Sequence, residues 1–196
     1  MALTHLLYLH GFRSSPQSAK ARQVAARIAQ RHPGVQWWCP QLPPSPRAAM
    51  DLVMQGIAAW PRERMGVIGS SLGGFYASCV AQATGCPCVL INPAVHPARD
   101  LAGHIGEHTA WHDPAQSFHF DKGFIRELEM LEPGPLAHPE RCFALIAKGD
   151  EVLDWREMVA RHPGARIRLL EGSDHALSDF DRHLDDVLAF LGLPSR

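Results

Sequence analysis

Gly69-Ser70-Ser71-Leu72-Gly73 follows the apolar run Met65-Gly66-Val67-Ile68 and precedes a helix-like segment rich in small residues, Phe75 to Thr84. The five residues match G-x-S-x-G, a turn that places a serine nucleophile between a strand and a helix. The turn strains the backbone, so the positions two residues to either side must be very small, and both are glycine. The following helix N-terminus offers N–H groups to an oxyanion. The stretch predicts Ser71 as a nucleophile; a glycine-rich packing turn is the alternative.

Short apolar runs alternate with segments of helical periodicity along most of the chain. The runs that predict strands are residues 6–9, 35–39, 65–68, 86–91, 142–147 and 166–170. Between them, apolar residues recur at i, i+3, i+4 and i+7, most clearly over 21–29, and predict helices. Ser178 with Asp181 resembles a capping box that starts the last helix. Strands joined by helices predict a parallel sheet that is covered on both faces.

The length of 196 residues predicts a single domain over 1–196, because domains commonly have about 100–200 residues. The region of about 96–140 breaks the alternation of strands and helices. It is mixed in character, rich in histidine and flanked by proline. We expect this region, called the 96–140 segment below, to be an insertion that forms a lid over one end of the sheet.

Charge and composition exclude several classes of function. Lys and Arg (19) nearly balance Asp and Glu (20), which gives no electrostatic footprint for nucleic acid or an acidic membrane surface. No run approaches the 18 apolar residues of a membrane span, and residues 1–10 are typical of a strand rather than a signal peptide. The five cysteines include no C-x-x-C pair, so we expect free thiols and a cytoplasmic protein.

A serine hydroxyl is a poor nucleophile at neutral pH and needs a base. His175 is the best placed of the 12 histidines, because it lies in the loop directly after the sixth predicted strand. In a parallel sheet, that loop is at the same end as the loop that carries Ser71. A neutral imidazole there can take the serine proton; a solvated loop histidine is the alternative.

The imidazole in turn needs an orienting carboxylate. Asp150 is the first acidic residue after the fifth predicted strand and is the predicted partner, with Asp154 in reserve. Asp174 adjoins His175 in the sequence, but a rigid orienting group is better supplied by a separate strand end. The resulting chain order of serine, aspartate and histidine is the order expected of α/β-hydrolases.

An oxyanion needs two N–H donors, and His10-Gly11-Phe12-Arg13 leaves the first strand at the same end of the sheet. We predict that the backbone N–H groups of Phe12 and Leu72 hold the oxyanion. Loss of one such donor typically costs roughly 3 kcal/mol of transition-state stabilisation. His10 is expected to anchor the loop rather than to carry a proton.

Substrate contacts are predicted at Gly11 and Arg13, beside the oxyanion donors, and at Trp111 in the 96–140 segment. Arg13, Lys20 and Arg22 are candidate contacts for an anionic group such as a CoA phosphate. A solvated cationic surface is the alternative for these three side chains.

Histidines in the 96–140 segment raise the question of a metal. His104, His108 and His112 are spaced i, i+4 and i+8 and would share one face of a helix, with His119 nearby. No cysteine or close acidic partner completes a zinc site, so we expect a polar surface there and neither a metal nor a cofactor.

The motifs together resemble the YqiA-like bacterial esterases, which are small α/β-hydrolases. They run from the first strand to the last loop: Leu6-Leu7-Tyr8-Leu9-His10-Gly11-Phe12, Ser14-Ser15-Pro16, Ser18-Ala19-Lys20-Ala21, Gly69-Ser70-Ser71-Leu72-Gly73-Gly74-Phe75-Tyr76, Asn92-Pro93-Ala94-Val95, Gly149-Asp150-Glu151-Val152-Leu153-Asp154 and Asp174-His175-Ala176. By this resemblance Ser71 would be the nucleophile, Asp150 the acid and His175 the base. The implied activity is hydrolysis of carboxylic esters, with acyl thioesters as a further class.

The expected fold is then a compact α/β-hydrolase with a six-stranded, mostly parallel sheet of order 2-1-3-4-5-6 and helices on both faces. The expected partner is a small-molecule ester or thioester. The sequence departs from the family most in the 96–140 segment, which leaves substrate size, acyl preference and oligomeric state open. The alternatives are a non-catalytic interaction protein on a hydrolase scaffold, a thioesterase or peptidase with the same triad, and a metal-dependent enzyme.

Overall fold

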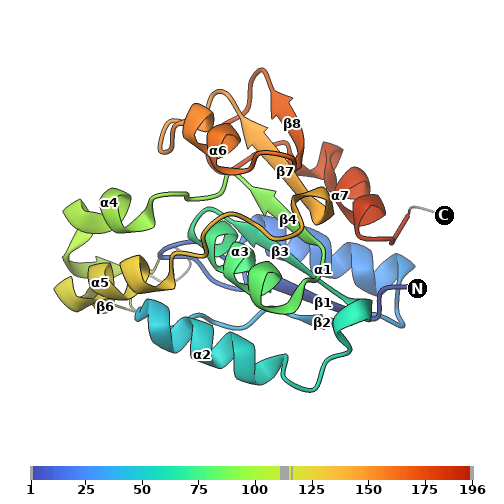
Figure 1. Cartoon of the computed structure of the whole chain (residues 1–196), viewed down its shortest axis with the longest axis horizontal. Helices are drawn as coiled ribbons and strands as arrows, with labels where there is room; N and C mark the ends of the chain where they lie inside the picture. Colours follow the sequence, from blue (N-terminus) through green and yellow to red (C-terminus); the bar gives the residue numbers. More distant parts are fainter. Residues whose placement is uncertain (1, 111–114, 116, 195–196) are drawn as a thin grey trace.

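Six parallel strands form the central sheet, in the order β2-β1-β3-β4-β7-β8 (Figure 1). The computed structural model describes residues 2–110, 115 and 117–194. The strands of the sheet are β1 (His5–Leu9), β2 (Gln36–Trp38), β3 (Met65–Ser70), β4 (Cys88–Ile91), β7 (Cys142–Ala147) and β8 (Arg166–Leu170). The predicted order 2-1-3-4-5-6 is confirmed, with β7 and β8 as the fifth and sixth strands of the sheet.

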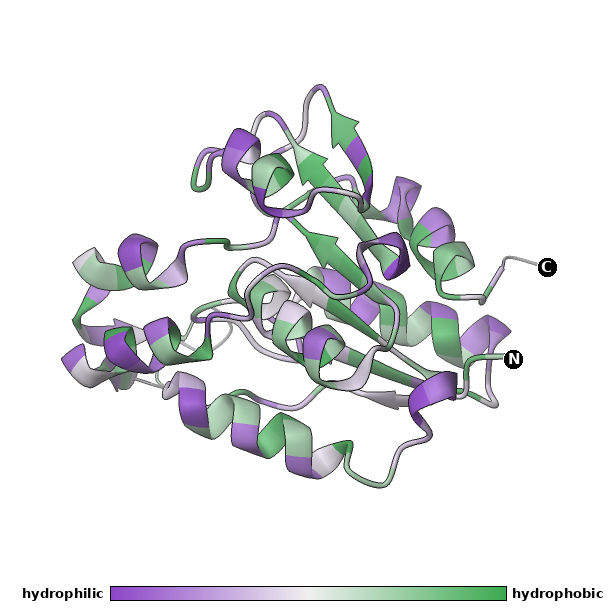
Figure 2. Cartoon of the chain, viewed as in Figure 1, coloured by the Kyte–Doolittle hydropathy of each residue, from purple (hydrophilic) through white to green (hydrophobic). Residues whose placement is uncertain are grey.

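Helices pack on both faces of this sheet, as predicted. Their bounds, with a 3₁₀ turn η1, are α1 (Ala19–Arg31), α2 (Pro46–Gly56), η1 (Arg62–Arg64), α3 (Leu72–Thr84), α6 (Trp155–Arg161) and α7 (Leu184–Phe190). Hydropathy follows the layers, with apolar residues along the strands and polar residues on the outer sides of the helices (Figure 2). The inner strands of the sheet are therefore a buried middle layer, whereas the edge strands β2 and β8 are partly exposed.

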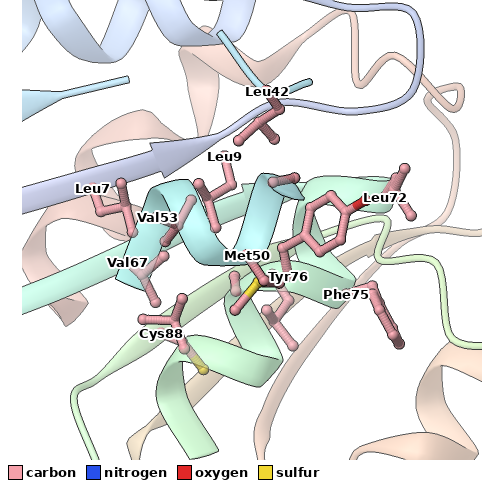
Figure 3. Packing of buried hydrophobic residues seen from close by; sticks show 14 of the residues in the cluster. Leu7, Leu9, Leu42, Met50, Val53, Val67, Leu72, Phe75, Tyr76 and Cys88 are labelled. Carbon is pink, nitrogen blue, oxygen red and sulfur yellow. The ribbon is translucent and has the colours of Figure 1, made fainter. Parts of the chain in front are cut away.

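Two apolar cores result from the alternation of side chains along each strand. Leu7 and Leu9 of β1 face α2, α3 and α6 in one core, whereas Leu6 and Tyr8 face α1 and α7 in the other. Figure 3 shows the first core, where Met50 of α2 lies among side chains of β1, β3 and α3. All four of the named β1 side chains are completely buried, which fixes the strand in its register.

The last helix starts later than predicted. A 3₁₀ turn η4 (Phe180–Arg182) comes first, and α7 begins at Leu184. Ser178 does not cap it: its N–H and Oγ–H both donate to the carboxylate of Asp174, at 2.9 and 2.6 Å. The predicted capping box of Ser178 and Asp181 is wrong, because a nearer carboxylate behind the serine takes both of its donors.

The 96–140 segment lies between β4 and β7 and has its own secondary structure. It contains α4 (Pro97–Leu101), η2 (Ala102–His104), β5 (Gly106–Thr109), β6 (Ser117–Phe120), α5 (Lys122–Leu131) and η3 (Pro139–Arg141). β5 and β6 form an antiparallel pair apart from the main sheet. In Figure 1, α4, α5 and β6 gather at one end of the molecule. A role of this segment as a lid stays a prediction.

Two predictions on the chain as a whole concern membranes and thiols. Among the described residues, none of the helices has both the length and the apolar character that crossing a membrane requires. All five cysteines are unpaired, as predicted, and Cys86, Cys88 and Cys142 are buried. The cytoplasmic location stays a prediction.

Candidate active site

Ser71 lies alone at the turn between β3, which ends at Ser70, and α3, which begins at Leu72. Its backbone has φ of 56° and ψ of −123°, a conformation that costs a non-glycine residue free energy. Three backbone hydrogen bonds hold it: the Ser71 N–H donates to Ile91 O at 3.0 Å, and Ser71 O accepts the N–H groups of Gly74 at 2.8 Å and Ala94 at 3.0 Å. The strained turn predicted from the motif is confirmed.

The two motif glycines lie where no side chain fits. A Cβ atom on Gly69 would be 2.1 Å from Gly73 O, and one on Gly73 would be 2.0 Å from Leu9 O. Both contacts are with backbone, which cannot rotate away. Helix α3 therefore packs directly on the ends of β1 and β3, and this close packing places Ser71 at the carboxyl edge of the sheet.

His175 reaches both of its predicted partners from the loop after β8. Its Nδ1 is 2.7 Å from Asp150 Oδ2, and its Nε2 is 3.0 Å from Ser71 Oγ. The Asp150 side chain is completely buried, and its Oδ1 accepts the N–H groups of Val152 and Leu153, each at 2.8 Å. The structure thus brings the three predicted residues together in one line of hydrogen bonds.

The direction of these hydrogen bonds follows from the chemistry of the carboxylate. An ionised carboxylate only accepts, so Nδ1 of His175 carries the proton and donates it to Asp150. In the neutral ring Nε2 then has a free lone pair and accepts the Ser71 hydroxyl. In this arrangement the ring can take the serine proton while the carboxylate holds its tautomer.

The two other candidate acids have different partners. Asp154 is the N-cap of α6, where its Oδ1 accepts the Arg156 N–H at 2.9 Å. The side chain of Asp174 accepts from Ser178, and these hydrogen bonds lower the pKa of its carboxyl group. The described contacts therefore favour Asp150 over both as the partner of the ring.

The loop after β1 lies directly against the serine. A Cβ atom on Gly11 would be 3.1 Å from Ser71 Cβ, so this loop and the turn after β3 are in close contact. Leu72 is the first residue of α3, where backbone N–H groups have no partner within the helix. The use of the Phe12 and Leu72 N–H groups as oxyanion donors stays a prediction.

The ring of Phe12 points into the 96–140 segment. Four rings surround it edge-on, with centroids 5.2–5.8 Å away: His104, His108, Phe118 and Phe120. Next to it, Arg13 has a φ of 59° and donates from Nε to Thr109 O at 2.9 Å. The loop beside Ser71 is therefore attached to β5 and β6 on both its apolar and its polar side.

His10 anchors this loop, as expected. It is buried, and its Nε2 accepts the N–H of Leu42 at 3.1 Å. Its Nδ1 therefore carries the proton and donates to Gly11 O at 3.0 Å. With both nitrogens bound to backbone, His10 joins the end of β1 to the proline-rich loop before α2.

A pocket of about 370 Å³ lies beside Gly11 and Leu72, the two residues next to Ser71. It lies between the loop after β1, the proline-rich loop and the 96–140 segment. Its lining residues are His10, Gly11, Phe12, Arg13, Ser14, Gln41, Leu42, Pro43, Pro44, Leu72, Tyr76, Ala110, Ser117 and Phe118. Two of the predicted substrate contacts, Gly11 and Arg13, line it; the third, Trp111, lies outside the described residues.

Lys20 and Arg22, the other two cations of the sequence prediction, do not line this pocket. Lys20 donates from Nζ to the carbonyl of Ala176, directly after His175. Burial lowers its pKa to about 8, against the opposing attraction of Asp174 and Asp150. Arg22 is exposed on α1. A role of these cations in binding an anionic group stays a prediction.

The histidines of the 96–140 segment do not share a helix face, which was the condition for the metal alternative. His104 ends a 3₁₀ turn and His108 lies in strand β5, so the helix assumed in the prediction is absent there; His112 lies outside the described residues. His119 pairs with Glu107, its Nδ1 2.8 Å from Oε1. Within the described part of the chain, no cluster of three or more His, Cys, Asp or Glu residues could hold a metal ion.

Two residues that contact the His175 backbone were missed at the level of sequence. Asn92, at the end of β4, donates from Nδ2 to the carbonyls of Asp174 and His175. Glu151 accepts the His175 N–H at 3.0 Å. Both lie in motifs of the family resemblance, Asn92-Pro93-Ala94-Val95 and Gly149-Asp150-Glu151-Val152-Leu153-Asp154, but no role was assigned to either.

Solved structures show the fold class. Alpha/beta hydrolase domain-containing protein 10 from mouse matches with a TM-score of 0.73 and 17% identity, over 95% of this chain and 90% of that one. Est1E from Butyrivibrio proteoclasticus matches with a TM-score of 0.71 and 12% identity, over 97% and 87%. At these identities the likeness concerns the fold alone, and the predicted α/β-hydrolase fold is confirmed.

Relatives in sequence include proteins of Yersinia. A UPF0227 protein of Yersinia enterocolitica is 27% identical over 125 residues, which are 63% of this chain and 63% of that protein. A UPF0227 protein of Yersinia pseudotuberculosis is 26% identical over 129 residues, 65% of each chain. The matched region spans less than two thirds of either relative.

A family model covers far more of the chain than these pairwise matches do. Residues 5–192 match the model described as "Uncharacterised protein family (UPF0227)". The matched range begins with β1 and extends beyond α7, so it includes every strand of the sheet and the residues around Ser71. The chain therefore belongs to the UPF0227 family, the YqiA-like group of α/β-hydrolases that its motifs resemble.

Proposed function

We propose that this protein is a serine hydrolase that cleaves carboxylic esters, with acyl thioesters as a second substrate class for the same chemistry. One observation carries the proposal. Asp150, His175 and Ser71 form a continuous line of hydrogen bonds, at 2.7 and 3.0 Å, that ends at a strained turn beside a pocket. A hydroxyl joined to a neutral imidazole and a buried carboxylate is activated as a nucleophile.

In the first half of the reaction, Ser71 Oγ attacks the acyl carbon while its proton passes to His175 Nε2. The carbonyl oxygen gains a negative charge, which the N–H groups of Phe12 and Leu72 stabilise. The bond between the acyl carbon and the leaving oxygen then breaks, and the imidazolium returns its proton to that oxygen. The alcohol leaves, and an acyl ester of Ser71 remains.

In the second half, water replaces the alcohol. His175 Nε2 takes a proton from the water, whose oxygen attacks the acyl carbon. Collapse of this tetrahedral adduct breaks the bond to Ser71 Oγ, which recovers a proton from the imidazolium. The products are a carboxylic acid and the free serine, and Asp150 stabilises the imidazolium in both halves.

The pocket beside Gly11 and Leu72 supports a small organic substrate. Its volume of about 370 Å³ lies within the range of ligand pockets, and much of its lining is apolar, including Leu42, Tyr76 and Phe118. Esters have an apolar body and one polar group, so they match this lining. The fold likeness adds nothing to this argument, because one fold carries many activities.

The test is turnover of p-nitrophenyl esters and of the matched CoA thioesters by the wild type and by Ser71→Ala. We expect Ser71→Ala to reduce kcat/KM by about 10⁴-fold or more with the fold intact. Ser70→Ala, on the adjacent serine at the end of β3, is the control and should retain activity. The ratio of ester to thioester rates decides between the two substrate classes.

An organophosphonate probe gives a test that needs no natural substrate. A serine hydrolase is labelled at Ser71, and Ser71→Ala is not. Near-normal turnover by Ser71→Ala, or an unlabelled wild type, would contradict the proposal and favour a non-catalytic interaction protein.

A further inference from the structure

The side chain of Asn92 makes three hydrogen bonds at the centre of the sheet's carboxyl edge. The residue is completely buried directly after β4. Its Nδ2 donates to Asp174 O at 3.0 Å and to His175 O at 3.1 Å, and its Oδ1 accepts the Ala147 N–H at 2.8 Å. Every polar atom of this amide therefore has a partner, and two of the partners lie in the loop that carries the imidazole.

The loop that Asn92 holds, residues 172–177, has neither helix nor strand. Two of its residues, Ser173 and Leu177, have left-handed backbone angles, with φ of 69° and 51°. Such angles cost free energy in non-glycine residues and persist only where the surroundings enforce them. The 172–177 loop thus depends on contacts from outside itself for its conformation.

Two other side chains bond to the backbone of this loop, and both are closer to solvent. Glu151, which accepts the His175 N–H, is exposed, and Lys20, which donates to Ala176 O, is half-buried. Hydrogen bonds that exchange with water are worth less than those of a buried amide, whose loss leaves groups without a partner. Asn92 is therefore the buried anchor among these three.

The position of Asn92 in the sheet explains why this anchor matters. β4 lies between β3, which leads to Ser71, and β7, which leads to Asp150. The imidazole must reach both at once, across the end of β4. Through Ala147 the amide is fixed to the end of β7, and through two carbonyls it is fixed to the 172–177 loop. One side chain thus sets the spacing between the element that holds the carboxylate and the loop that holds the ring.

An amide is the group that these three contacts require. Aspartate would keep the acceptor for the Ala147 N–H but would place a carboxylate oxygen against two carbonyl oxygens. Leucine, of similar size, would leave all three backbone groups without a partner. The φ of 40° at this position also suits asparagine, which is enriched in left-handed conformations.

We infer that Asn92 is a positioning residue, which holds the backbone at His175 so that the ring contacts Asp150 and Ser71 together. The inference rests on the proposed function, because it assigns a role in that reaction. Misplacement of a catalytic group by about 1 Å can cost about 100-fold in rate. Loss of the anchor should therefore lower kcat and leave KM unchanged, since Asn92 does not line the pocket.

The decisive variant is Asn92→Asp, which keeps the bond to β7 and removes the two bonds to the loop. The matched control is Val89→Ala, the truncation of a completely buried side chain of β4, the strand that precedes Asn92; Val89 makes no side-chain hydrogen bond to the loop. We expect kcat for a p-nitrophenyl ester to fall by about 10- to 100-fold in Asn92→Asp at unchanged KM. Val89→Ala should lose stability while its folded fraction keeps the wild-type kcat.

A second measurement does not depend on activity. The proton on His175 Nδ1, shared with Asp150, should give a low-field proton NMR signal in the wild type and in Val89→Ala. In Asn92→Asp this signal should broaden or vanish. If Asn92→Asp does not fold, Asn92→Gly, which suits the left-handed backbone, takes its place in both measurements with the same expectation.

Wild-type kcat and an intact low-field signal in the folded variant would overturn the inference. So would a loss of activity that only follows the unfolded fraction, as in Val89→Ala, because Asn92 would then stabilise the fold alone. A wild type without ester turnover, combined with loss of the signal in Asn92→Asp, would contradict the proposed function and leave the positioning role supported.

Discussion

Asp150 and His175 meet through a 2.7 Å hydrogen bond, and the carboxylate is completely buried whereas 21% of the imidazole side chain is exposed. Water therefore reaches the ring but not the acid. In the described structure the carboxylate accepts hydrogen bonds from the N–H groups of Val152 and Leu153 and from the ring, and the Lys20 ammonium attracts it. Replacement of this acid should consequently act on the ring.

Asp150→Asn should reduce kcat/KM by about 10⁴-fold with little change in the fold. The amide oxygen still accepts the N–H groups of Val152 and Leu153. The amide nitrogen, however, donates to His175 Nδ1 and so places the ring proton on Nε2, where it can no longer accept the proton of Ser71. Steady-state kinetics with a p-nitrophenyl ester measure the loss.

Asp154→Asn is the matched control, because Asp154 caps α6 and asparagine caps helices about as well as aspartate. We expect wild-type activity from it. An inactive Asp154→Asn beside an active Asp150→Asn would move the orienting role to Asp154.

Lys20 should make stability depend on pH in the alkaline range. Burial lowers the pKa of its ammonium group from the ordinary value of 10.5 to about 8. Between these two values Lys20 binds more protons in the unfolded chain than in the folded chain, so its contribution to the free energy of unfolding rises with pH across this window. Burial raises the pKa values of thiols such as Cys39 and Cys79, which lowers stability with rising pH in both proteins. Chemical denaturation at several pH values should therefore show the effect of Lys20 as a difference: the unfolding free energy of the wild type minus that of Lys20→Met increases across this window.

Arg22→Met provides the comparison, since it removes an exposed cation from the same helix. It should keep the slope of the wild type between about pH 8 and pH 10.5. Equal slopes in the wild type and in Lys20→Met would disprove the effect of burial on Lys20.

Gly73→Ala should prevent stable folding. The added Cβ would lie 2.0 Å from Leu9 O, a backbone atom, so α3 would have to move away from β1. The cost should exceed the about 1–3 kcal/mol that is typical of an overfilled core. Thermal denaturation followed by circular dichroism measures it.

The control for this variant is Gly34→Ala, where no atom lies within 4 Å of the added Cβ. Its stability should stay within about 0.5 kcal/mol of the wild type. A fully stable Gly73→Ala would show that the helix can shift at no cost, against the close packing described above.

The sheet and the line of three residues were predictable because both follow from simple geometry. Continuous apolar runs indicate strands buried on both faces, and the carboxyl ends of parallel strands share one edge. Ser71, Asp150 and His175 lie one, three and five residues after the ends of β3, β7 and β8. Their convergence therefore required only the strand order.

Contacts across the sheet edge were not predictable in the same way. Asn92 bonds to groups 55 and 82–83 residues away, and its partners are backbone carbonyls and an N–H, which every residue has. No residue type in the sequence marks such partners. The prediction of the capping box was wrong for a related reason. Asp174 and Asp181 carry the same carboxylate group, and the sequence does not show that Ser178 bonds to Asp174.

The histidine spacing in the 96–140 segment was ambiguous for a physical reason. Residues at i and i+4 share a face in a helix, but they also share a face in an extended strand. His104 and His108 are neighbours, with ring centroids 5.9 Å apart, although the backbone between them is a 3₁₀ turn and the start of β5. The spacing of the histidines alone therefore could not distinguish a helix from an extended strand.

The ring of Phe12 links the loop beside Ser71 to the 96–140 segment. It packs among the rings of His104, His108, Phe118 and Phe120. The 96–140 segment borders the pocket and also supports the loop beside Ser71. If the proposed function is correct, exchange of this segment with that of another family member should alter the rate of acyl transfer as well as the choice of acyl group. The exchanged segment must therefore supply rings that pack against Phe12 as well as new residues that line the pocket.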